Sequence, residues 1–120
     1  KYKYGQNRIS AYFLKNYHKY LWKTSIDTIK KGTQVIPCLA GQSHMVIWGD
    51  GNISSCEMLP SFGNIKDKKI SNLIGSPEYK EQIRGIKNKE CHCTHNCALI
   101  TSISFNPKKW VNLAYQKKPK

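Results

Sequence analysis

The chain has 120 residues, enough for one domain with one modest core. Its formal charge is +13, and nearly all of the positive charge is lysine, since Arg8 and Arg84 are the two arginines. Specific recognition of phosphate or guanine favours the planar arginine side chain, so nucleic acid is not an expected partner. We expect most lysines to form a solvated surface.

The cysteine count and the hydropathy indicate the cellular compartment in which the protein is expected. Five cysteines are an odd number, which fits a closed disulfide framework poorly and favours a reduced, intracellular protein. No apolar run approaches the roughly 20 residues of a membrane span, and no apolar signal segment is found. The expectation is a cytoplasmic protein without a membrane partner.

An amphipathic helix is predicted between residues 7 and 31, because apolar and aromatic residues recur there at steps of three and four. Gly32 supplies the expected helix end. His18 is expected at the surface or boundary of this helix. The residues expected to line the core are Ile9, Phe13, Tyr17, Tyr20 and Leu21.

A β-hairpin is predicted next, because two strand-like runs, residues 44–48 and 52–56, flank the dipeptide Asp50-Gly51. Gly51 allows the positive φ of a tight turn. The hairpin carries the chain from Cys38 out and back to Cys56. These two cysteines should therefore meet at one end of the sheet.

Short helices follow the hairpin in the predicted order. After a loop with a short extended piece at residues 63–65, one or two helical turns are expected at residues 70–74. Ser76 and Pro77 predict a helix start, with Ser as N-cap, and that helix should reach Lys87. Further helices are predicted at residues 98–105 and from Asn106-Pro107 onward. The predicted fold is α+β, a small hairpin followed by short helices around a cysteine-ligated site, preceded by an N-terminal helix.

The cysteines are the chemical centre of the sequence. Three of them fall within seven residues, and thiolates held so close together repel each other unless a cation or disulfides neutralise them. A zinc site is one interpretation, with four thiolates or with thiolates and one of His44, His92 or His95 as ligands, although no Cys-x2-Cys knuckle is present. An iron–sulfur cluster accepts thiolates from separate loops more readily and is favoured over zinc and over free buried thiols. The candidate ligands are Cys38, Cys56, Cys91, Cys93 and Cys97.

Nucleophilic catalysis is not expected from this site. Cys91 or Cys93 beside His92 or His95 has the composition of a catalytic pair, but sequence neighbours rarely have the required orientation. We therefore predict no catalytic residue.

A resemblance to a known family is carried by three stretches, PCLAGQSHMVIWGDGNISSCEMLP, FGNIKD and ECHCTHNCA. They resemble the SPASM/twitch region of radical S-adenosylmethionine enzymes over roughly residues 36–99. The spacing Cys38-x12-Gly51-x4-Cys56 matches the opening pattern of the family. The closing group Cys-x-Cys-x3-Cys is shorter than the closing pattern of a full SPASM domain.

The resemblance implies one auxiliary [4Fe-4S] cluster, as in the shorter twitch form, because five cysteines cannot ligate two clusters fully. Cys38, Cys56 and Cys97 are the first expected ligands. The fourth is Cys93 or Cys91, with Cys93 preferred. His92 and His95 are expected as exposed spacers rather than as donors to cluster sulfurs.

The Cys-x3-Cys-x2-Cys motif that binds the S-adenosylmethionine-cleaving cluster in that family is absent from this sequence. The chain is expected to be a fragment of a larger oxidoreductase, non-catalytic alone, with the radical core domain as its partner. S-adenosylmethionine would bind only in that core, and the substrate would be a peptide, a protein side chain or a small metabolite.

The expected divisions of the chain are 1–34 (connecting helix), 35–105 (cluster-binding domain) and 106–120 (helix and basic tail). The alternative is a zinc-stabilised module whose lysine face binds nucleic acid or an acidic peptide.

Overall fold

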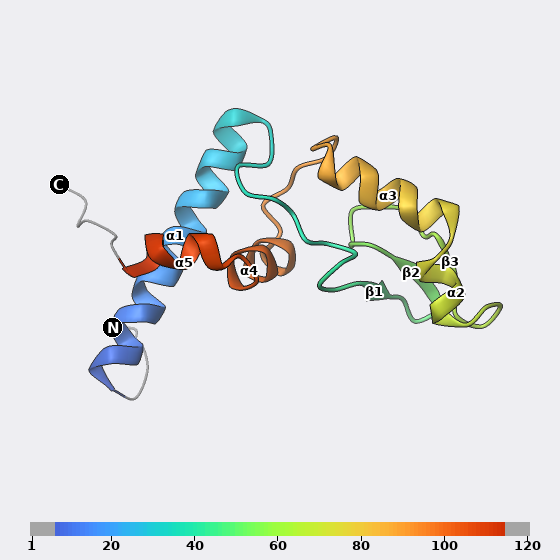
Figure 1. Cartoon of the computed structure of the whole chain (residues 1–120), viewed down its shortest axis with the longest axis horizontal. Coiled ribbons are helices and arrows are strands. Elements are labelled where there is room, and N and C mark those ends of the chain that lie inside the picture. Colours follow the sequence, from blue (N-terminus) through green and yellow to red (C-terminus); the bar gives the residue numbers. More distant parts are fainter. Residues whose placement is uncertain (1–6, 115–120) are drawn as a thin grey trace.

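A computed structural model describes residues 7–114 of the chain (Figure 1). The elements form two lobes in a molecule of 52 × 33 × 24 Å. The helical lobe comprises α1 (Arg8–Lys31), α4 (Asn96–Ser104) and α5 (Pro107–Ala114), which pack on one another. The sheet lobe comprises β1 (Val46–Ile47), β2 (Asn52–Ser54), β3 (Gly63–Asn64), α2 (Ile70–Ile74) and α3 (Pro77–Lys87). This confirms the predicted α+β class and the N-terminal helix.

The long helix α1 begins and ends where local capping chemistry dictates. The Asn7 side chain accepts a hydrogen bond from the backbone N–H of Ser10 at 2.8 Å, and Gly32 ends the helix with φ of 59°. One hydrophobic cluster joins α1 to the chain that follows it and to α4, through Leu21, Ile36, Leu99 and Ile103, with Tyr17 and Tyr20 packed against it. The described part of the chain contains no helix long and apolar enough to cross a membrane.

The predicted core face of α1 is wrong at its N-terminal end. Ile9 and Phe13 are 72% and 51% exposed. The helix has 24 residues and is therefore about 36 Å long, whereas its partners α4 and α5 have nine and eight residues. Such short partners cannot cover the full length of α1.

The sheet has three antiparallel strands in the order β1-β2-β3. Val46 pairs with Ser54 in the hairpin, and Ile53 pairs with Gly63 across β2 and β3. The hairpin turn forms as predicted, with Gly51 at φ of 92° and the Asp50 carboxylate accepting the backbone N–H of Asn52 at 3.0 Å. A second hydrophobic cluster joins β2 to α2 and consists of Ile53, Phe62 and Leu73.

The two helices that flank the second cysteine group begin differently. Ser76 caps α3 as predicted, accepting the Tyr79 N–H at 3.1 Å, and Ile86 is buried near the end of that helix. Helix α4 begins at Asn96, two residues earlier than predicted, and its N-cap residue His95 makes no side-chain capping bond. The earlier start places Cys97 in the first turn of α4.

Candidate metal centre

Two connecting segments cross between the lobes and carry most of the cysteines (Figure 1). One follows α1 and contains Cys38, and the other precedes α4 and contains Cys91 and Cys93. A cavity of about 320 Å³ lies against both segments, and its wall also includes Cys56, from the turn after β2. This volume is far larger than one buried water requires. Four cysteines from three separate segments therefore surround one space.

The rest of the cavity wall is largely apolar and comes from both lobes. The helical lobe contributes Ala98 and Leu99, and the sheet lobe contributes Ile86 together with Met58 and Leu59 from the loop after β2. Apolar walls limit the access of water and lower the local dielectric constant. Such surroundings favour thiolates that are bound to a cation over free thiolate anions.

The thiols around this cavity influence one another. Burial raises the pKa of the Cys38 thiol, and the neighbouring Cys93 and Cys56 raise it further. Burial likewise raises the pKa of the Cys91 thiol, and Cys38, Cys56 and Cys93 add to the effect. The side chains are therefore close enough to repel as thiolates. A bound cation would displace the thiol protons and remove this repulsion.

Gln34 joins the two connecting segments from a buried position. Its amide nitrogen donates to the backbone carbonyls of Cys91 at 2.8 Å and Ile86 at 3.0 Å. Its amide oxygen accepts the backbone N–H of Cys38 at 3.2 Å. One side chain thus fixes the backbone at two candidate ligands that are far apart in sequence.

Two buried serines hold the backbone beside the other parts of the cavity. Ser102 of α4 accepts the backbone N–H of Leu39 at 3.1 Å, next to Cys38. Ser54 donates to the carbonyl of Cys56 at 2.9 Å and accepts the indole N–H of Trp48 at 3.3 Å. The positions of Cys38 and Cys56 are therefore set by hydrogen bonds as well as by the hairpin.

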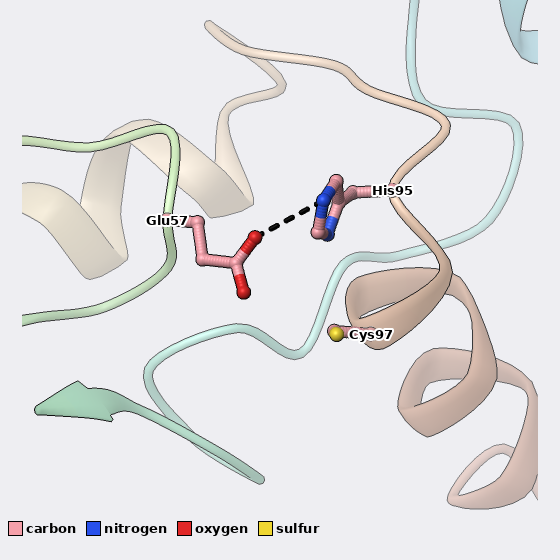
Figure 2. Close-up of side chains that lie close together, drawn as sticks. All are labelled: Glu57, His95 and Cys97. Atoms are coloured by element: carbon pink, nitrogen blue, oxygen red, sulfur yellow. Dashed lines mark ion pairs between the residues drawn. The ribbon is translucent and has the colours of Figure 1, made fainter.

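Cys97 lies apart from the larger cavity, beside Glu57 and His95 (Figure 2). Nε2 of His95 lies 3.0 Å from Oε2 of Glu57, and the possible ligand atoms of all three residues lie within 4.8 Å of one another. All three side chains are exposed. A smaller hollow of about 20 Å³ also has Cys97 in its wall, together with Cys56 and Cys93.

The structure thus brings Cys38, Cys56, Cys91 and Cys93 to one cavity and leaves Cys97 outside it. None of the five forms a disulfide. The ligand set expected from the sequence, with Cys97 in it and with Cys91 as the alternative, stays a prediction. His92 is exposed at the wall of the larger cavity, and Nδ1 of His44 lies 3.1 Å from the hydroxyl of Thr101.

Sequence reasoning missed Gln34 and Glu57. Neither residue lies in a metal-binding motif. Two of the three hydrogen-bond partners of Gln34 are 52 and 57 residues away in sequence, and Glu57 and His95 are 38 residues apart. The sequence signal for Glu57 was its position directly after Cys56, and for Gln34 there was none.

The donor chemistry fits an iron–sulfur cluster, since thiolates on several loops around one largely apolar cavity are the ligand type that such clusters use. A family model described as SPASM, an iron-sulfur cluster-binding domain, matches residues 38–98. No curated protein and no solved structure matches the chain. The matched range contains all five cysteines and covers just over half of the sequence. The chain therefore belongs to the SPASM family of iron-sulfur cluster-binding domains.

Proposed function

We propose that this chain is the auxiliary domain of a radical S-adenosylmethionine enzyme and binds a single [4Fe-4S] cluster. The observation that carries the proposal is the convergence of four cysteines on one largely apolar cavity within the matched family range. Four thiolates are the full ligand requirement of one such cluster. The one remaining cysteine, Cys97, cannot supply the ligands of a second cluster.

Cys38, Cys56 and Cys93 are common to the ligand sets suggested by the sequence and by the cavity. The two sets differ in the remaining ligand, which is Cys97 in the set implied by the family resemblance and Cys91 in the set that lines the cavity. We choose Cys91, because it lies at the same cavity as the other three cysteines and because all three raise the pKa of its thiol. Cys97 is exposed and does not line that cavity.

When bound, the cluster supplies one-electron chemistry or an iron to which a substrate atom can bind. The residues of this chain hold and shield it. Gln34 and Ser102 fix the backbone of the ligating loops, and the side chains of Ile86 and Leu99 limit water access. Burial and hydrogen bonds around the sulfurs would set the reduction potential of the cluster.

The radical-generating step belongs to a separate core domain, which is the proposed partner. The substrate class is a peptide, a protein side chain or a small metabolite. The domain would serve either electron transfer or substrate engagement, and the parent enzyme would be an oxidoreductase. On its own this chain is not expected to turn over a substrate.

Single cysteine substitutions test the ligand set. The chain is reconstituted anaerobically with iron and sulfide, and iron is measured per folded chain in Cys38→Ala, Cys56→Ala, Cys91→Ala, Cys93→Ala and Cys97→Ala. We expect the first four to lose most of their iron and Cys97→Ala to retain it, because only Cys97 lies outside the cavity. Circular dichroism identifies variants that fail to fold.

Two outcomes of this series would contradict the proposal in different ways. Iron content that is indifferent to both Cys38 and Cys56 would contradict the site itself. Loss of iron in Cys97→Ala, with retention in Cys91→Ala, would keep the cluster and exchange the fourth ligand.

A further inference from the structure

A second group of donor side chains lies beside the proposed cluster cavity and is not used by it. Glu57 comes from the loop after β2, while His95 and Cys97 come from the start of α4 (Figure 2). The carboxylate and the imidazole are in contact, with 3.0 Å between Oε2 and Nε2. The Cys97 sulfur is within 4.8 Å of the ligand atoms of both. One thiol, one imidazole and one carboxylate therefore converge from two separate segments.

This set of donors matches the ligand preference of zinc. Zn²⁺ binds Cys sulfur, His nitrogen and carboxylate oxygen at about 2.0–2.3 Å, with tetrahedral geometry. Donors bound to one such ion lie about 3.5 Å apart, so small side-chain rotations would bring these three to an ion. Their exposure makes those rotations inexpensive, because no packed neighbour has to move.

The charges also match. A thiolate and a carboxylate balance the two charges of the ion, and neutral imidazole completes the three protein ligands. An exposed Glu–His pair by itself stabilises a protein little, so the contact alone gives no reason for a thiol at this position. Three protein ligands leave the fourth position to water or to an incoming ligand.

We propose that Glu57, His95 and Cys97 form a mononuclear site for a zinc-class divalent cation at the edge of the cluster cavity. The smaller hollow that contains Cys97 also touches Cys56 and Cys93, so the two metal sites would be neighbours. The proposal gives the fifth cysteine a function. It requires Cys97 to be free of the cluster, but it does not require the cluster to be present.

The test measures zinc and iron together on the full chain. Anaerobically reconstituted protein is equilibrated by dialysis against a low, buffered concentration of Zn²⁺, and both metals are counted per chain. We expect one zinc in addition to the cluster iron. Cys97→Ser and His95→Ala should lose the zinc and keep the iron. Glu57→Gln should weaken zinc binding at least about tenfold.

Glu81→Gln is the matched control, because Glu81 is also an exposed carboxylate in a short ion pair, with Arg84. It should bind zinc like the unchanged chain. Co²⁺ provides a second readout, since a cobalt–thiolate charge-transfer band should appear in the unchanged chain and be absent from Cys97→Ser. Because the three substituted side chains are exposed, folding should be unaffected, and circular dichroism verifies this.

Each remaining outcome overturns the inference. Absence of bound zinc in the unchanged chain, or zinc binding equal in all variants, would show that no specific site exists. Loss of iron in Cys97→Ser would make Cys97 a cluster ligand and remove the proposed zinc site, while the cluster-binding function would stand.

Discussion

Ser54 and Ser55 are adjacent, both are fully buried, and they differ in their hydrogen bonds. The Ser54 hydroxyl bonds to the Cys56 carbonyl and the Trp48 indole, whereas the Ser55 hydroxyl is a buried oxygen without a partner among the described residues. A satisfied buried hydroxyl stabilises by about 1 kcal/mol, whereas an unsatisfied one is a cost. The neighbouring serines should therefore respond oppositely to removal of the hydroxyl.

We predict that Ser54→Ala lowers the free energy of unfolding by roughly 1–2 kcal/mol. Ser55→Ala should leave it unchanged or raise it by up to about 1 kcal/mol. Thermal melting of the reconstituted protein under anaerobic conditions would measure both, each variant serving as the other's control. Equal destabilisation by the two substitutions would contradict the hydrogen-bond pattern described for this turn.

Single-residue features that depend on neighbours in sequence could be predicted. The Ser76 cap, the Gly32 helix end and the Gly51 turn each follow from chemistry within about four residues. The burial of Ser54 and Ser55 could not be predicted, because it depends on the packing of helix α3 and the loop after β2 against the hairpin. Polar residues in or next to a strand normally indicate a solvent-exposed position, and here Ser54 at the end of β2 and Ser55 after it are both buried.

At the scale of elements, the connection between the two cysteine-bearing segments depends on Gln34. Replacing it with alanine would leave the carbonyls of Ile86 and Cys91 and the N–H of Cys38 without this partner. Buried groups left unpaired cost about 1–3 kcal/mol, and the ligating loops would lose their fixed separation. We therefore predict that Gln34→Ala lowers both the thermal midpoint and the iron content.

Gln42→Ala is the matched control, since Gln42 is exposed in the nearby turn. Iron content and melting temperature of that variant should match those of the unchanged chain. The rate of cluster loss on exposure to a chelator would distinguish a role of Gln34 in positioning the cysteines from a role in general stability. Gln34→Ala should lose its cluster faster than Gln42→Ala. Equal rates in the two variants would remove Gln34 from the site.

The elements themselves were largely predictable, and their mutual packing was not. Periodicity and caps predicted α1, α3 and the hairpin, because these patterns are local. The exposure of Ile9 and Phe13 depends on the lengths of α4 and α5, which lie far away in the sequence. The cysteine spacing predicted a shared site, and the structure places four cysteines at one cavity. The position of Cys97 outside that cavity could not be predicted, because it depends on long-range packing.

At the scale of the whole molecule, the +13 charge predicts weak, unspecific attraction to polyanions. Two arginines are few for specific contacts to bases, and Arg84 is already paired with Glu81 in its own helix. Binding to duplex DNA should therefore weaken steeply as the salt concentration rises from about 50 to 200 mM, as counterion release requires. Fluorescence anisotropy with two unrelated duplexes measures it. Tight, sequence-dependent binding at the higher salt would instead support a basic binding module.

The central claim is that the chain holds one [4Fe-4S] cluster, and the most direct test is metal and sulfide analysis of anaerobically reconstituted protein with its visible absorption spectrum. We predict a brown protein with about four irons and four acid-labile sulfides per chain. A colourless protein that takes up no iron or sulfide, and whose cysteines bind zinc alone, would contradict the claim.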